Sequence, residues 1–282
     1  MRHFVRAGGR YAVAGRVVAV TGGGRGIGER IAARFAEAEA RVAVGDLDEA
    51  AATRVAATLG DGHLGLPLDV ASAASFAAFL EESERSLGPV DVLVNNAGVM
   101  WVGPFTDEPE VSLRRQVEVN LIGVMHGVRL AVPVMATRGS GHIVTIASAG
   151  SVLTLPGEAT YAATKHGVLG YLKAVREELR GSGVDVSVVM PAVVDTELAA
   201  GTATGLARRL TPDRVAEAVI DVLTRPRFEV SIPRYVDPLN RAVSLLPRPV
   251  RDAVTRRLVP NQLRQCDPTA RAAYQSRLEA DD

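Results

Sequence analysis

Strand-like and helix-like segments alternate along the chain from residue 16 to about residue 232. Apolar, β-branched runs such as Val17–Val20 predict strands that are covered on both faces of a sheet. The segments between them repeat apolar residues at helical spacing, as Ile27, Ile31 and Phe35 do. Because strands that alternate with helices pair in parallel through right-handed crossovers, this pattern predicts one doubly wound α/β domain with a mostly parallel sheet.

The pattern also predicts the limits of the elements. Strands are expected over residues 16–21, 41–45, 63–68, 90–94, 142–147, 184–190 and 227–232, and helices over 26–39, 47–59, 72–87, 111–136, 159–180 and 211–223. We therefore expect a domain over residues 15–235 and an N-terminal extension over residues 1–14. Residues 236–282 should form a C-terminal helical extension that packs on the domain or its subunit interface.

The composition is that of a soluble globular protein, with 47% hydrophobic and 23% charged residues. A formal net charge of zero gives no reason to expect a nucleic-acid partner. Cys266 is the single cysteine, so an intramolecular disulfide is excluded. The first fifteen residues do not read as a signal peptide, and no run of about 18 apolar residues predicts a spanning helix. We expect a cytoplasmic protein.

A glycine-rich turn follows the first expected strand and opens the first expected helix. Its sequence is Thr21-Gly22-Gly23-Gly24-Arg25-Gly26-Ile27-Gly28. Glycines let the chain turn tightly and let backbone N–H groups approach a pyrophosphate at the helix N-terminus. The spacing differs from the commoner Gly-x-Gly-x-x-Gly, and a flexible turn is the alternative interpretation. Its place after the first core strand favours a dinucleotide site.

Asp46 ends the second expected strand, 18 residues after Gly28. A carboxylate there can accept hydrogen bonds from the adenosine ribose hydroxyls, and it would repel the 2′-phosphate of NADP. Arg25 favours the opposite choice, because a cation in the glycine turn could reach that phosphate. Since Asp46 would sit directly on the ribose, we expect NAD to be preferred and NADP not to be excluded. Asp46 could also be the N-cap of the helix expected to begin at Leu47.

Further motifs follow the later strands. They are Asp69-Val70, Asn95-Asn96-Ala97-Gly98, Asn120, Ser148 and Tyr161-Ala162-Ala163-Thr164-Lys165. With the glycine turn, and with Ser148 standing 13 residues before Tyr161, the chain resembles the short-chain dehydrogenase/reductase family over roughly residues 15–232. The resemblance implies a Rossmann-type fold. It also implies an NAD(P)-dependent oxidoreductase that interconverts an alcohol and a ketone or aldehyde.

Tyr161 is the expected proton donor or acceptor of that reaction, with Lys165 beside it. A free tyrosine has a pKa near 10 and is a poor base at neutral pH. Lys165 is four residues on, hence on the same helix face, and it is one of only two lysines among 32 basic residues. A cation about 4 Å away at an effective dielectric of about 20 contributes roughly 4 kcal/mol, which could lower the pKa of Tyr161 to about 7.

The resemblance assigns roles to other residues as well. Ser148 would donate to the substrate oxygen, and Asn120 would support a water that relays protons between Lys165 and solvent. A turn residue and a buried helix-bend amide are the respective alternatives. Asp69 and Val70 would flank the adenine. The remaining expected cofactor contacts are Gly22, Gly24, Arg25, Gly26, Ile27, Gly28, Asn96, Ala97, Gly98, Pro191, Val194 and Thr196.

The segment from Pro191 to Thr196 sits where the family usually has Pro-Gly and then Thr. Thr196 and the Val194 backbone would hold the nicotinamide carboxamide. Ala192 replaces the usual glycine, which leaves the local backbone conformation open.

The substrate pocket is expected to be apolar, with Met100, Trp101, Leu153 and Leu155 as candidate walls. Ordinary core packing is an equally good interpretation of Met100 and Trp101. The five histidines and the single cysteine show no metal-ligand spacing, so no metal is expected.

Beyond about residue 235 the chain is basic and amphipathic. Between Asn240 and Arg264 there are six arginines and one acid, Asp252, among apolar residues at helical spacing. Such a segment can lie on an anionic membrane surface. Packing on the domain, over the substrate cleft or in a homodimer or homotetramer interface is the interpretation that we favour.

The sequence therefore predicts an oxidoreductase acting on an apolar alcohol or carbonyl compound. There are two alternatives. One is a non-catalytic dinucleotide-binding sensor, and the other is an NAD-dependent epimerase or dehydratase on the same fold. Fold-level resemblance does not identify the substrate.

Overall fold

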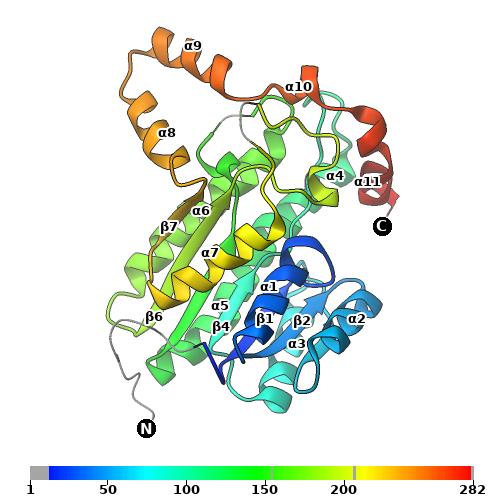
Figure 1. Ribbon diagram of the computed structural model, residues 1–282, viewed down its shortest axis with the longest axis vertical. Helices are drawn as coiled ribbons and strands as arrows, with labels where there is room; N and C mark the ends of the chain where they lie inside the picture. The colour runs from blue at the N-terminus through cyan, green and yellow to red at the C-terminus, as the bar shows by residue number, and fades with distance from the viewer. Residues whose placement is uncertain (1–12, 154, 206–207, 281–282) are drawn as a thin grey trace.

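The structure, a computed structural model, describes residues 13–153, 155–205 and 208–280 (Figure 1). Most of the expected N-terminal extension therefore lies outside the described residues. In the described part of the chain, seven strands form one sheet in the order β3-β2-β1-β4-β5-β6-β7, and every neighbouring pair is parallel. This is the doubly wound fold that the alternation predicts.

The strands begin and end within a few residues of their expected limits. They are β1 (Val17–Thr21), β2 (Arg41–Asp46), β3 (Leu64–Pro67), β4 (Val92–Asn95), β5 (Gly141–Ile146), β6 (Val184–Pro191) and β7 (Glu229–Ile232). The helices of the expected domain are α1 (Gly26–Glu37), α2 (Glu49–Leu59), α3 (Ala73–Leu87), α4 (Glu110–Val117), α5 (Gly123–Arg138), α6 (Ala159–Glu178) and α7 (Pro212–Thr224).

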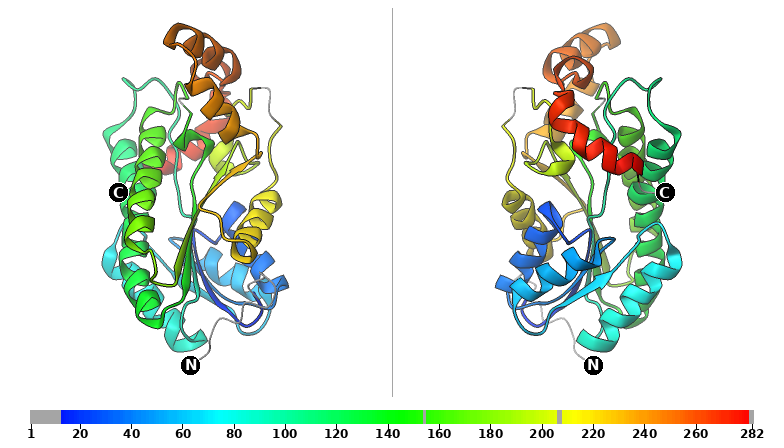
Figure 2. Two further views of the ribbon diagram at one scale, coloured as in Figure 1. Left: turned by 90° about the vertical axis from the view of Figure 1, so that its left-hand side faces the viewer. Right: turned by 90° about the vertical axis from the view of Figure 1, so that its right-hand side faces the viewer.

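Helices cover the sheet on both faces, which gives the three layers seen edge-on in Figure 2. On one face Phe35 of α1 and Val219 of α7 pack against β-branched residues of the strands. On the other face Phe76 of α3 and Val168 of α6 do the same. Each such fully buried side chain contributes roughly 1.5–3 kcal/mol, so both faces contribute to the stability of the sheet.

The expected helix over residues 111–136 is not uniform. It consists of α4, a π-helical turn over Glu118–Ile122 and α5. By length and composition the whole run Glu110–Arg138 would also suit a membrane-spanning helix. Here α5 packs on α3, β4 and β5, and the π turn packs on α6. The apolar side chains of this run therefore belong to the helical layer on one face of the sheet.

Between β7 and residue 280 the structure describes four more helices: α8 (Val236–Ser244), α9 (Arg248–Leu258), α10 (Gln262–Gln265) and α11 (Pro268–Ala280). The pair α8 and α9 stands off the domain, whereas α10 and α11 return along it toward α4 (Figures 1 and 2). The chain after residue 235 thus crosses the end of the domain at which β5 and β6 finish.

Candidate active site

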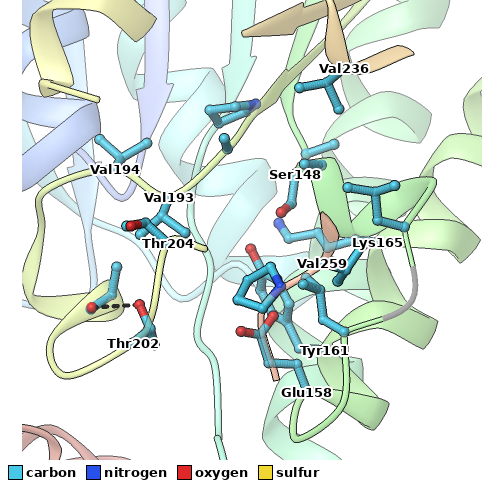
Figure 3. A pocket seen from close by; sticks show the side chains of 18 of the residues that line it. Ser148, Glu158, Tyr161, Lys165, Val193, Val194, Thr202, Thr204, Val236 and Val259 are labelled. Atoms are coloured by element: carbon cyan, nitrogen blue, oxygen red, sulfur yellow. Dashed lines mark hydrogen bonds between the residues drawn. The ribbon is translucent and has the colours of Figure 1, made fainter. Parts of the chain in front are cut away.

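The sheet order reverses between β1 and β4, and ligands of open α/β sheets bind beyond the strand ends at such a point. A cavity of about 440 Å³ lies there, within the usual size range of small-molecule sites. Its mainly apolar walls come from α1, from the segments after β4, β5 and β6, and from α8 and the chain around the end of α9 (Figure 3).

The glycine turn between β1 and α1 is packed too closely for larger residues. A Cβ at Gly28 would lie 2.1 Å from the Gly22 carbonyl oxygen, and one at Gly22 would lie 2.7 Å from the Ala97 Cα. Gly22 and Gly26 also have φ angles of 61° and 58°, which favour glycine. Arg25 is the N-cap of α1 and forms no side-chain cap there. The first N–H groups of α1 are thus suited to bind a pyrophosphate, as the sequence predicts.

Asp46 holds the glycine turn against β2. Its carboxylate accepts hydrogen bonds from the Gly24 N–H at 2.8 Å and from the Asp48 N–H at 3.1 Å. The alternative interpretation of Asp46 as a helix N-cap is wrong, because α2 begins at Glu49 and Asp48 caps it by accepting from the Ala51 N–H. The partly exposed Asp46 carboxylate therefore stands beside the glycine turn, where a ribose would lie.

Arg25 forms ion pairs with two carboxylates of the protein. Its guanidinium lies 3.5 Å from both Asp48 and Glu197, and its side chain is more than half exposed. Arg277 shares Glu197 at 3.0 Å. With Asp46, three carboxylates and two arginines stand at this edge of the glycine turn, so their formal charges sum to −1.

The loop after β4 is tied to the glycine turn by Asn96. Its Nδ2 donates to the backbone oxygens of Thr21 at 3.0 Å and Gly22 at 2.9 Å. Asn96 and Gly98 line the cavity, and a Cβ at Gly98 would lie 3.6 Å from Lys165 Nζ. Two hydrogen bonds therefore hold the loop after β4, which carries three of the expected cofactor contacts, against the glycine turn.

Asn120 lies in the π-helical turn and is fully buried. Its Oδ1 accepts from the Val99 N–H, and its Nδ2 donates to the Val99 carbonyl, both at 2.8 Å. Nδ2 also lies 3.2 Å from Thr164 Oγ1 on α6. π turns often occur at functional sites, where they change the direction of a side chain. Asn120 thus positions the loop after β4 against α6, and its expected water relay to Lys165 stays a prediction.

Ser148, Tyr161 and Lys165 meet on one wall of the cavity (Figure 3). Ser148 follows β5, and its Oγ accepts from the Gly150 N–H at 3.0 Å. Tyr161 and Lys165 share one face of α6, with Lys165 Nζ 5.6 Å from the centre of the Tyr161 ring. Lys165 Nζ also donates to the Ile146 carbonyl at 3.3 Å. The structure therefore brings together the three groups that the sequence singles out.

Burial is the main cause of the shifted pKa values of Tyr161 and Lys165. It raises the pKa of Tyr161 above its ordinary value, and the nearby Glu158 carboxylate adds to the rise. Burial lowers the pKa of Lys165 to about 8. The expectation that Lys165 brings the pKa of Tyr161 to about 7 is wrong for the protein's own groups. Desolvation of the buried phenolate is the largest cause of the raised pKa, and Lys165 is not among the groups that shift the pKa of Tyr161.

The segment after β6 contributes a second wall. Pro191, Ala192, Val194 and Thr196 all line the cavity, and a Cβ at Gly26 would lie 3.5 Å from the Thr196 methyl group. The backbone conformation at Ala192, which the sequence left open, is one that a residue with a side chain can adopt. Among non-glycine residues of the described chain, positive φ occurs only at Glu39, so the backbone at 192 does not require glycine.

Three of the four candidate pocket residues line the cavity, namely Met100, Leu153 and Leu155. For Trp101 the alternative interpretation, core packing, agrees with the structure. Its buried side chain is not part of the described cavity wall, and its backbone N–H donates to Gln116 Oε1 at 3.1 Å. Trp101 is a packing residue of the loop that precedes α4.

Asp69 and Val70 occupy the loop between β3 and α3. The exposed Asp69 carboxylate accepts from the Ala71 N–H at 2.9 Å, and the buried Val70 packs against Gly123. Their expected contact with the adenine stays a prediction.

Sequence reasoning missed a buried polar cluster on the same wall, which includes Glu158. The Glu158 side chain points into the cavity beside Tyr161, and its burial raises its pKa to about 7 (Figure 3). Arg271 and Gln262, from the C-terminal extension, oppose this rise. Glu158 is the N-cap of α6 and stands three residues before Tyr161, so both residues belong to the beginning of the same helix, a signal that could have revealed Glu158.

Arg271 of α11 is fully buried and fastens the extension to the cavity wall. It donates to the carbonyls of Leu198 at 2.9 Å and Ala200 at 3.1 Å, and to that of Met100. Gln262 similarly exchanges two hydrogen bonds with the backbone of Ala203. Since these partners lie far away in the sequence, no local pattern could have indicated the contacts.

This geometry can be compared with known proteins. The family model described as short chain dehydrogenase matches residues 16–206. The chain belongs to the short-chain dehydrogenase family. It is therefore an oxidoreductase of that family, as the motifs from the glycine turn to Lys165 predict.

Members of the family similar to this chain differ in substrate. Ketoacyl reductase HetN of Nostoc sp. is 32% identical over 228 residues, which cover 77% of this chain and 78% of that protein. The 2-dehydro-3-deoxy-L-rhamnonate dehydrogenase (NAD(+)) of Sphingomonas sp. is 36% identical over 67% of this chain and 76% of its own length. Membership in the short-chain dehydrogenase family thus leaves the substrate open.

The structural likeness extends over most of the fold. A short-chain dehydrogenase/reductase from Burkholderia phymatum, solved in complex with NAD, is 27% identical with a TM-score of 0.76. The alignment covers 82% of this chain and 93% of that one.

Proposed function

We propose that this short-chain dehydrogenase interconverts an alcohol and a ketone or aldehyde with a nicotinamide dinucleotide, with Tyr161 as general acid and base. The observation that carries the proposal is the convergence of Ser148, Tyr161 and Lys165 on one wall of a cavity next to the glycine turn. The relative solved with NAD supports the choice of cofactor. When bound, the nicotinamide would exchange a hydride with the substrate carbon, and its oxidised ring would add positive charge near Tyr161.

The chain's own residues handle the substrate oxygen and its proton. Ser148 Oγ holds the oxygen by donating a hydrogen bond to it. Tyr161 gives a proton to a carbonyl oxygen during reduction and removes one from a hydroxyl group during oxidation. Because burial raises the pKa of Tyr161, the neutral phenol that reduction needs is the prevailing form at neutral pH. Lys165 stabilises the phenolate that oxidation needs.

The charges beside the glycine turn favour NAD over NADP. Asp46 stands where it can accept hydrogen bonds from the ribose hydroxyls. Arg25, the one residue that argued for NADP, is shared between Asp48 and Glu197. A 2′-phosphate would therefore meet Asp46 without a free counter-charge.

The cavity supports an apolar substrate. Leu153, Leu155 and Met100 flank the reacting wall, and Val236 and Val243 of α8 face it from the extension. An apolar alcohol gains about 25 cal/mol for each Å² of surface that such walls remove from water.

A panel of apolar secondary alcohols and the matching ketones, assayed with both cofactors, tests the proposal. With cofactor deuterated at the transferring position, deuterium should appear on the product carbon as the nicotinamide absorbance changes. An epimerase or dehydratase would instead return an isomer or an alkene without net change of cofactor. A sensor would bind the cofactor without turnover. Either of these two results would contradict the proposal.

A further inference from the structure

Helices α8 and α9 form a hairpin that stands clear of the sheet and its covering helices (Figures 1 and 2). Neither helix contains a buried residue, although both carry large apolar side chains. Leu245 is 86% exposed, and Leu239, Leu246, Val250 and Leu258 are exposed as well. Apolar side chains that a helix pair leaves exposed indicate a contact with an apolar environment outside the described chain.

The hairpin and the residues after it are strongly basic. Residues 236–264 carry six arginines and two acids, Asp237 and Asp252, hence a net charge of +4, while the formal net charge of the whole chain is zero. Arg248 and Arg251 lie near Asp252. Arg256 and Arg257 are exposed and form no ion pair with any other residue that the structure describes. Uncompensated positive charge therefore adjoins the exposed leucines.

The cavity opens under this hairpin. Tyr235, Leu239 and Leu258 line the cavity and are also exposed to solvent, so they form part of its rim. Asn240 and Thr255 line the same side. A molecule that leaves the apolar side of the hairpin can thus reach Tyr161 without crossing the domain.

We propose that the α8–α9 hairpin docks on a lipid bilayer surface that carries anionic headgroups, and that an apolar substrate enters the cavity from that surface. The exposed leucines would insert among the acyl chains near the headgroups, while the arginines contact the phosphates. A second copy of the chain fits this face less well, because a twofold contact would bring the same arginines together. The entry of substrate rests on the proposed function, whereas the docking does not.

Vesicle flotation of the full chain tests the docking without using enzyme activity. Vesicles of phosphatidylcholine alone are compared with vesicles in which part of it is replaced by phosphatidylserine. The chain should float only with the anionic vesicles. Binding should weaken as added salt shortens the Debye length from about 8 Å to about 3 Å.

Two surface variants locate the contact. Each basic residue near an anionic bilayer is worth about 1 kcal/mol, so Arg256→Gln with Arg257→Gln should lower the partition coefficient about 30-fold. Leu245→Ser with Leu246→Ser should lower it about tenfold or more. The matched controls are Arg54→Gln with Arg225→Gln and Phe105→Ser with Val134→Ser, all exposed residues outside the hairpin, and they should float like the wild type.

Two results would overturn the proposal. The first is a chain that stays at the bottom of the gradient with anionic vesicles. The second is a leucine variant that floats like the wild type but sediments as a smaller oligomer, since the hairpin would then be a contact between copies of this chain.

Discussion

Replacement of Glu158 by Gln should make the stability of the protein less sensitive to pH. Glu158 is 5% exposed, and its burial raises its pKa to about 7. An acid whose pKa is higher in the folded protein binds its proton more tightly there than in the unfolded chain. Its contribution to stability is therefore fully present below the unfolded pKa and is lost as the pH rises through 7.

The size of this contribution follows from the two pKa values. The unfolded value is near 4.5 and the folded one about 7. At about 1.4 kcal/mol per pH unit, the contribution is about 3 kcal/mol. Glutamine keeps the shape and the acceptor but cannot ionise. The unfolding free energy of the variant minus that of the wild type should therefore rise by about 3 kcal/mol between pH 4.5 and pH 8.

Urea denaturation of both proteins at several pH values measures this difference. Subtraction is needed because His142, whose pKa is lowered to about 4 by burial, loses its own contribution as the pH falls through 4. His142 is common to both proteins, so its effect cancels. A difference that stays flat, or that falls with pH, would show that Glu158 is ionised and held by Arg271, and would refute the reasoning.

Further predictions concern the cofactor, the extension and the pH profile. Asp46→Asn, which removes the charge and keeps an acceptor, should raise the ratio of kcat/KM with NADP to that with NAD about tenfold or more; an unchanged ratio in steady-state kinetics would mean that Asp46 does not set the preference. Arg271→Met should cost about 3 kcal/mol in urea denaturation because three carbonyl oxygens lose a donor, whereas exposed Arg277→Met on the same helix should cost little. Since burial raises the pKa of Tyr161, alcohol oxidation should speed up as pH rises through the neutral range while carbonyl reduction does not; coinciding pH profiles would count against this assignment.

The fold and the reacting groups could be predicted because their signals are local. A strand that is covered on both faces needs a continuous apolar run, and a glycine turn needs glycines where φ is positive, as at Gly22 and Gly26. Tyr161 and Lys165 are one helical turn apart, so their shared face follows from spacing alone. Ser148 follows from its place directly after a strand.

The remaining features depend on contacts between distant parts of the chain. Trp101 and its neighbour Met100 are both apolar, so the sequence does not distinguish them. Only the packing of the loop places Met100 in the cavity wall and Trp101 outside it. The raised pKa of Tyr161 is not predictable from the sequence, because residue spacing reveals a neighbouring charge but not the desolvation of the phenol. Arg271 reaches the carbonyl of Met100 across 171 residues, and no local pattern indicates such a contact.

Turnover of the Tyr161→Phe variant tests the central claim most directly. Loss of a general acid and base costs a factor of about 10²–10⁴, so turnover of the best substrate should fall by about that much, while the Kd for NADH measured by fluorescence changes less than about tenfold. Tyr171→Phe is the matched control, because Tyr171 lies on the same helix but outside the described cavity wall. Turnover of the Tyr161→Phe variant close to that of the wild type would contradict the account.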